Sequence, residues 1–298
     1  MAGLLPDPVS RAGAVRHAVL TPELAAQLAG DPDHQVRRQV AEHPQLPPPV
    51  RDLLAEGSSA NVRVGVFSRP DTPEPIRHQI YTEIQQGDRP LTDLLNDELD
   101  DTALLRQFED HMAVAELSYL RLDWVTADPL PYVSSPYICF RRSAARNRTL
   151  PADAVLRLLN DDDSGVRTTM AAHAPHLVDP TMAERIDREF RPDKETRWRP
   201  ADLFTFPPQI LRRLATDPDP RMRCLAPRDP DLPVEMAESL SIDPDSAVRR
   251  TIAGYPHLPV HVRRALLADP NEWVAQTAAA AATLPVAEMD RLLALAGV

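Results

Sequence analysis

The sequence predicts an all-α protein built as a solenoid of about eight 26-residue repeats, each holding one α-helix and one shorter helix. The first observation is a pair of similar phrases: DPDHQVRRQVAEHPQLP begins at Asp31, and DPDSAVRRTIAGYPHLP begins at Asp243. The second is its period, because Asp-Pro pairs begin at Asp217, Asp243 and Asp269, which are 26 residues apart. The third is the scarcity of strand signals, since the chain has 9 Gly and no strand-like alternation.

Each repeat is expected to bury an apolar stripe against its neighbours. A Leu-Pro pair opens the first helix, since proline is tolerated in a first helical turn, where its missing amide donor is not needed. An Asp-Pro pair then ends that helix and caps the shorter second one, which stops before another proline. We call the residues at equivalent positions of successive repeats a column. The most regular apolar column of the first helix consists of Leu28, Leu54, Ile80, Leu158, Leu214, Leu240, Leu266 and Leu292.

The repeat unit, LPxxVxxxLAxDPxxxVRxxVAxxPxLP, resembles the leucine-rich repeat variant family and, more widely, the HEAT-like α-solenoids. The match covers roughly residues 10–80 and 131–298. The resemblance implies α-helices alternating with short 3₁₀-type helices in a right-handed superhelix. It does not extend to the iron–sulfur cluster of the founding type, because Cys139 and Cys224 stand alone inside repeats. No cofactor and no metal are therefore expected.

The repeat spacing fails between about residues 80 and 130. We expect N-terminal repeats over residues 1–79, an irregular acidic helical insertion over 80–130, and C-terminal repeats over 131–298, all within one continuous solenoid. The apolar residues of the interval keep helical spacing, which indicates helices rather than disorder.

One pair of columns carries an Asp at the break between helices and an Arg six residues later. We interpret it as a structural ladder, in which the Asp caps the short helix and the Arg pairs with that Asp or with its neighbour in the next repeat. The alternative is a basic stripe that binds phosphate or carboxylate ligands. The ladder comprises Asp31, Arg37, Asp161, Arg167, Asp217, Arg223, Asp243 and Arg249.

Columns that vary between repeats are the candidates for recognition, because solenoids use such positions to line a groove. The alternative is ordinary variation at solvent-facing positions. The groove candidates are Arg38, His43, Arg69, Arg142, His173, Arg250 and Tyr255. A second candidate is an aromatic patch that binds a partner or, alternatively, forms a local core; it consists of Tyr119, Trp124, Tyr132 and Tyr137.

No catalytic residue is assigned, since the chain has no phosphate loop, GxSxG, HExxH or cysteine–histidine motif. The predicted function is a non-enzymatic scaffold that binds a protein or peptide partner. One alternative is nucleic-acid recognition of the HEAT-like DNA-glycosylase kind, with Trp124 beside Asp123 or Asp128, which the formal net charge of −11 disfavours. Another is an accessory lyase or chaperone on a HEAT-like frame.

No membrane partner is expected, because no stretch approaches the roughly 20 apolar residues of a membrane span. The two cysteines form no disulfide framework, which favours a cytoplasmic location.

Overall fold

The structure is a computed structural model that describes residues 7–281 apart from 58, 88–100 and 191–197, together with residues 286, 290, 291 and 294. Every regular element in these residues is an α-helix or a 3₁₀ helix, and they contain no strand. The predicted all-α class is therefore confirmed. Among the same residues, no helix combines the length and the apolar character that crossing a bilayer requires.

The chain divides into two compact units, Met1–His173 and Ala174–Val298. The first contains α1 (Pro8–His17), α2 (Pro22–Ala29), α3 (His34–Glu42), α4 (Pro48–Ala55), α5 (Ala60–Phe67), α6 (Glu74–Gly87), α8 (Asp101–Tyr119), α9 (Asp123–Ala127), η1 (Leu130–Tyr132), α10 (Ile138–Ala144), α11 (Ala152–Leu159) and α12 (Ser164–His173). The second contains η2 (Pro175–Leu177), α13 (Pro180–Glu189), η3 (Pro200–Leu203), α14 (Pro208–Leu214), α15 (Pro220–Arg223), η4 (Ala226–Arg228), α16 (Val234–Ser241), α17 (Ser246–Ala253), α18 (Val260–Leu267) and α19 (Glu272–Ala280).

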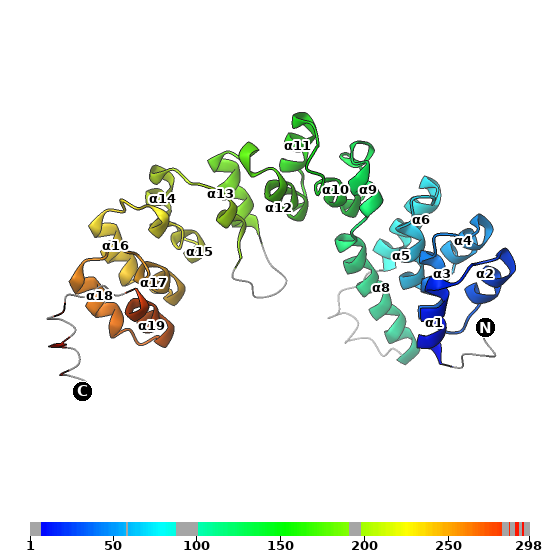
Figure 1. The fold of residues 1–298 in the computed structure, drawn as a ribbon, viewed down its shortest axis with the longest axis horizontal. Helices are drawn as coiled ribbons and strands as arrows, with labels where there is room; N and C mark the ends of the chain where they lie inside the picture. Colours follow the sequence, from blue (N-terminus) through cyan, green and yellow to red (C-terminus); the bar gives the residue numbers. More distant parts are fainter. Residues whose placement is uncertain are drawn as a thin grey trace. The chain divides into compact units, whose positions relative to one another are not determined.

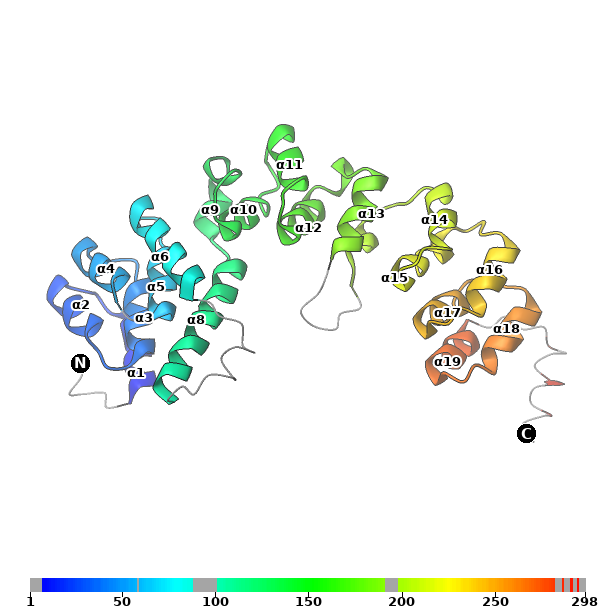
Figure 2. The same ribbon diagram turned by 180° about the vertical axis from the view of Figure 1, so that it is seen from behind.

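Helices of each unit lie in two rows, one made by the first helix of each repeat and the other by the second. In the first unit, α2, α4 and α6 contact one another in sequence, and α1, α3, α5 and α8 form the second row (Figure 1). In the second unit, α16 and α18 lie in one row, and α15, α17 and α19 lie in the other (Figure 2). Helices two apart in the chain are thus neighbours in space, as a repeat of helix pairs requires.

The apolar column predicted from the period lies between the rows. Leu28, Leu54 and Ile80 are each at most 3% exposed in the first unit, and Leu240 is 2% exposed in the second. The remaining described members, Leu158, Leu214 and Leu266, are buried as well. Leu292 lies outside the described residues.

Capping differs from the prediction in one respect. The N-cap of α17 is Asp245, whose side chain accepts from the Ala247 amide, rather than Asp243. Asp33 caps α3 and Asp219 caps α15 in the same way. The Asp two residues earlier lies before the helix and accepts from the N-cap amide, and it has a further role that is described below.

The interval predicted to be irregular lies inside the first unit. Its acidic residues 88–100 lie outside the described residues, but the helix that follows them is regular. Helix α8 contacts α5, α6 and α10, so it continues the row that α1, α3 and α5 begin. The division at His173 falls elsewhere than the limits of the predicted intervals.

Candidate binding surface

Two of the four ladder arginines, Arg223 and Arg249, join consecutive repeats. Arg223 donates from Nε and Nη2 to the two carboxylate oxygens of Asp243 in the next repeat, at 2.7 and 2.8 Å. Its Nη1 donates to the main-chain carbonyls of Asp217 and Pro218 in its own repeat, at 2.8 and 3.1 Å. The guanidinium thus spans the break between helices and fixes the register of the following repeat.

The same bidentate pair links Arg249 to Asp269, and Arg141 to Asp161. Arg11, which the predicted ladder does not include, links to Asp31. In each pair the acceptor lies 20 residues after the arginine.

Other ladder members depart from this pattern. Asp217 accepts from Arg188 rather than from Arg167. Arg37 bonds the carbonyls of Asp31 and Pro32 in its own repeat, and Gly57 stands where the next aspartate would be. Arg167 likewise donates to the main-chain carbonyls of its own repeat, at Asp161 and Asp162.

The ladder aspartate has both carboxylate oxygens engaged. Asp243 accepts from the Asp245 amide at 2.8 Å as well as from Arg223. Burial by itself would raise the pKa of Asp243, but these hydrogen bonds and the charges of Arg223 and Arg249 lower it below its ordinary value. Most of the hydrogen-bonding capacity of these arginines is therefore used inside the fold, which leaves little for an external phosphate.

Four of the predicted groove residues are buried inside the stack instead, and the fourth, Arg142, is described below. His43 is 5% exposed, and its Nε2 lies 3.0 Å from the carbonyl of Ala18 in the preceding repeat. Arg69 is 6% exposed and donates to the carbonyl of Ala41. The prediction that this column lines a groove is wrong for these residues, because their side chains satisfy main-chain carbonyls left between successive repeats.

Tyr255, the third such residue, is 4% exposed. Its hydroxyl donates to the carbonyl of Pro230 at 2.7 Å and accepts from the Leu232 amide at 3.1 Å. The hydroxyl thus joins two repeats of the second unit, and the groove prediction fails here for the same reason.

The aromatic patch is mostly a core. Tyr137 is 1% exposed and its hydroxyl donates to Glu74 at 2.7 Å, while its ring lies 5.3 Å from that of Phe140. Trp124 packs edge-on against Tyr132 at 5.4 Å, and the Trp124 indole nitrogen donates to the Ser68 carbonyl.

These rings join α5, α6, α9 and α10, where the repeat spacing is interrupted. The interpretation as a local core holds for three of the four residues. Tyr119, which is 57% exposed, is the exception.

Three groove candidates share one geometry, because each reaches the residue 23 positions later in the next repeat. Arg38 donates from Nη1 to the main-chain and side-chain oxygens of Asn61, at 2.5 and 2.7 Å. Arg142 lies against Gly165, where an added Cβ would collide with the guanidinium. Arg250, which is exposed, lies 5.7 Å from the Trp273 ring.

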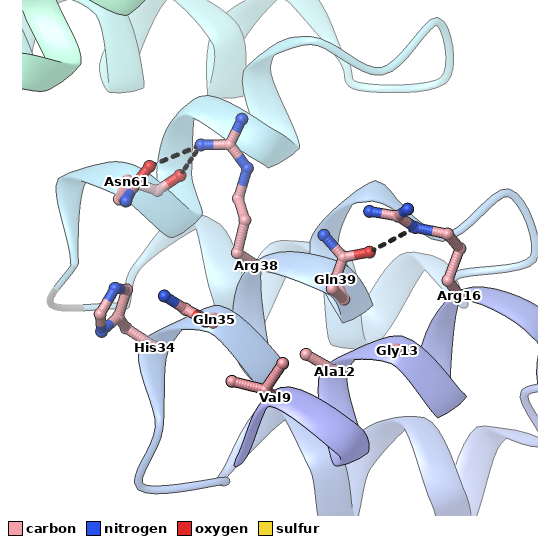
Figure 3. A pocket seen from close by; sticks show the side chains of 9 residues that line it. All are labelled: Val9, Ala12, Gly13, Arg16, His34, Gln35, Arg38, Gln39 and Asn61. Carbon is pink, nitrogen blue, oxygen red and sulfur yellow. Dashed lines mark hydrogen bonds between the residues drawn. The ribbon is translucent and has the colours of Figure 1, made fainter.

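An open pocket of about 360 Å³ lies on α1, α3 and α5, and we name it the α3 pocket. Helix α1 gives an apolar wall with Val9 and Ala12, and Gly13 leaves space where a side chain would stand. Figure 3 shows the residues that line it, which are Val9, Ala12, Gly13, Arg16, His34, Gln35, Arg38, Gln39 and Asn61.

Three side-chain amides and three basic side chains form the polar wall of the α3 pocket. Gln39 accepts from Arg16 Nε at 3.2 Å, and Asn61 accepts from Arg38 (Figure 3). Gln35 is exposed at the mouth. A primary amide both donates and accepts, so these groups match the alternating amides and carbonyls of an extended peptide backbone.

The charge of the α3 pocket is nearly balanced. Arg38 bonds Glu42 at 2.6 Å and Glu116 of α8 at 2.5 Å. Burial opposes the charge of Arg38, but the hydrogen bonds and charge of Glu116 outweigh it and raise its pKa above the ordinary value. The guanidinium therefore stays charged and fixed in place, while its field is neutralised locally.

Helix α8 presents an exposed apolar stripe next to this pocket. Leu104, Phe108, Met112 and Tyr119 are 40, 51, 51 and 57% exposed, at the spacing of one helical face. Glu116, the partner of Arg38, lies on the same helix between Met112 and Tyr119. The opposite face, with Ala113 and Leu117, is buried.

The second unit holds a pocket of about the same volume, around 360 Å³, beside Cys224 and Thr251. Its two arginines are already engaged, because Arg199 pairs with Asp187 and Arg228 pairs with Asp202.

Sequence reasoning missed a set of buried arginines on the first helix of the repeat. Arg51, Arg77 and Arg263 are 7, 5 and 3% exposed, and each donates to main-chain carbonyls. Arg77 also lies 5.0 Å from the Phe140 ring. The sequence did contain a signal for these structural arginines, because Arg51 and Arg77 are one repeat period apart.

No group of three or more His, Cys, Asp or Glu side chains that could hold a metal ion occurs in the described part of the chain. Both Cys139 and Cys224 are free thiols. The chain matches no protein-family model and none of the curated proteins compared with it.

Proposed function

We propose that the protein is a binding scaffold: a repeat solenoid of the leucine-rich repeat variant or HEAT-like kind, which binds an extended peptide segment of a partner protein. The binding surface consists of the α3 pocket and the adjoining exposed stripe of α8. The helix pairing within each unit and the ladder between repeats support the solenoid part of this proposal.

The observation that best supports this function is the presence of side-chain amides in the wall of the α3 pocket. The side-chain amides of Gln35 and Asn61 offer backbone-like hydrogen bonds, and Val9, 69% exposed, offers an apolar contact. The α8 stripe adds side-chain pockets of the kind that apolar peptide residues fill.

Peptide fits this surface better than nucleic acid does. Phosphate binding depends on uncompensated cations, whereas Arg38 is held by Glu42 and Glu116. The whole chain also carries a formal net charge of −11.

Selection from a random peptide display library tests the proposal. Selected peptides should bind the parent with micromolar dissociation constants, and Asn61→Ala with Gln35→Ala should weaken them about tenfold, because two backbone hydrogen bonds are lost. Arg157→Ala on the distant helix α11 is the control and should leave affinity unchanged. Duplex or single-stranded DNA binding more tightly than any peptide would overturn the proposal.

A further inference from the structure

Five basic side chains gather where α8, α10 and α12 meet in the first unit. We call Arg121, Arg142, Arg146, Arg148 and His173 the α10 basic cluster. Arg142 and Arg146 are four residues apart at the end of α10, and Arg121 follows α8. The charges of Arg121 and Arg142 act on Arg146, and those of Arg146 and Arg148 act on His173, so the groups lie close together.

Acidic partners neutralise only part of this cluster. Arg142 pairs with Asp163 at 3.0 Å, and Arg121 pairs with Asp123 at 3.1 Å. Arg146 and Arg148 form no ion pair with any residue that the structure describes. This differs from Arg223 and Arg249 of the ladder and from Arg38, whose guanidinium groups each pair with a carboxylate.

Three nitrogen atoms of the cluster are buried without a hydrogen-bond partner within the described chain: Nε of Arg142, Nε of Arg146 and Nδ1 of His173. Burying a polar atom unpaired costs free energy, so proteins rarely leave three together. Burial, followed by the charges of Arg121 and Arg142, lowers the pKa of Arg146. Burial and the charges of Arg148 and Arg146 likewise lower the pKa of His173.

Neighbouring residues fix the position of Arg142 within the cluster. Gly165 lets the Arg142 guanidinium cross the start of α12, since any larger residue would displace it. Arg142 lies 5.1 Å from the ring of Tyr119, the last residue of the exposed α8 stripe. The cluster therefore stands at the end of the apolar stripe, on the same row of helices as the α3 pocket.

We propose that the α10 basic cluster is an anion site that binds a carboxylate or phosphate group on the partner peptide, with Arg146 and Arg148 as its principal ligands. The inference rests on the proposed peptide-binding function and adds the partner's chemistry: apolar residues for the α8 stripe, followed by an acidic or phosphorylated residue. An oxyanion would neutralise the surplus cations and accept from arginine donors that the fold leaves unused.

Fluorescence polarisation at low salt tests this with four labelled probes: octaglutamate, octaglutamine, and one serine peptide with and without a phosphate. Octaglutamate or the phosphopeptide should bind the full chain at least tenfold more tightly than its neutral counterpart. Preference for one of the two identifies the carboxylate or the phosphate as the natural group. Arg146→Gln should remove roughly tenfold of that affinity. Arg157→Gln, with the same change in net charge, should not.

Thermal unfolding separates binding from a structural role. Without added anion, Arg146→Gln should melt no lower than the parent, because it removes repulsion rather than a bond. Inorganic phosphate should raise the melting temperature of the parent more than that of the variant. A destabilised Arg146→Gln, or equal binding of acidic and neutral probes, would overturn the anion site. If display-selected peptides still bind in that case, the peptide scaffold survives; if they do not bind either, both proposals fail.

Discussion

Arg249→Ala is the sharpest perturbation of the ladder. The wild-type guanidinium makes two hydrogen bonds to Asp269, at 2.7 and 3.1 Å, and one of 2.8 Å to the Asp243 carbonyl. The Asp269 side chain is only 6% exposed, so the substitution leaves a nearly buried carboxylate without its cation. Hydrogen bonds to charged groups contribute about 1.5–3 kcal/mol, and breaking a buried pair costs about 3–5 kcal/mol.

Because Asp269 keeps its bond from the Asn271 amide, we expect an intermediate loss of about 2–4 kcal/mol, which lies between these two ranges. Urea unfolding followed by circular dichroism measures it.

The neighbouring Arg250→Ala is the matched control. Arg250 is exposed and only approaches the Trp273 ring, a contact that contributes about 0.5–1 kcal/mol. The two variants remove the same side chain from adjacent positions of one helix. A loss below about 0.5 kcal/mol for Arg249→Ala, or a larger loss for Arg250→Ala, would refute the assignment of Arg249 as the residue that joins the repeats.

Three further predictions concern the core, the thiols and acid. Leu240→Ala should cost about 2–5 kcal/mol in the same urea assay, since Leu240 is 2% exposed. Cys139, 1% exposed and with its pKa raised by burial to about 12, should react with a thiol reagent at least tenfold more slowly than the less buried Cys224. The pKa of Asp243 is lowered in the fold, so its pairing stabilises above about pH 4 and is lost as pH falls further; Asp243→Asn should flatten the fall in stability below pH 4.

The period made the helices and their buried column predictable. Leu54 in the first unit and Leu240 in the second are both buried. They occupy equivalent positions of a repeated helix, which packs against its neighbours in the same way each time. The sequence also predicted that Arg pairs with Asp, since the two residues recur together. That an arginine would pair with the aspartate 20 residues later was not predictable. The spacing shows that both residue types recur, but it does not show which arginine contacts which aspartate.

The candidate site was harder to predict, for a physical reason. A variable column can face solvent or face the gap between repeats, and its sequence looks alike in both cases. His43 and Arg69 fill such gaps, whereas Arg38 lines the α3 pocket. The uncompensated charge of Arg146 also depends on residues distant in sequence, such as Arg121, so no local sequence motif predicts this charge.

Hydrogen–deuterium exchange with a display-selected peptide tests the peptide-binding surface most directly. Saturating peptide should slow exchange in α3 (His34–Glu42), α5 (Ala60–Phe67) and α8 (Asp101–Tyr119), the helices that carry the α3 pocket and the apolar stripe. The other row, α2, α4 and α6, should change little, because its helices do not line that surface. Protection confined to α2, α4 and α6, or confined to the second unit, would contradict the account.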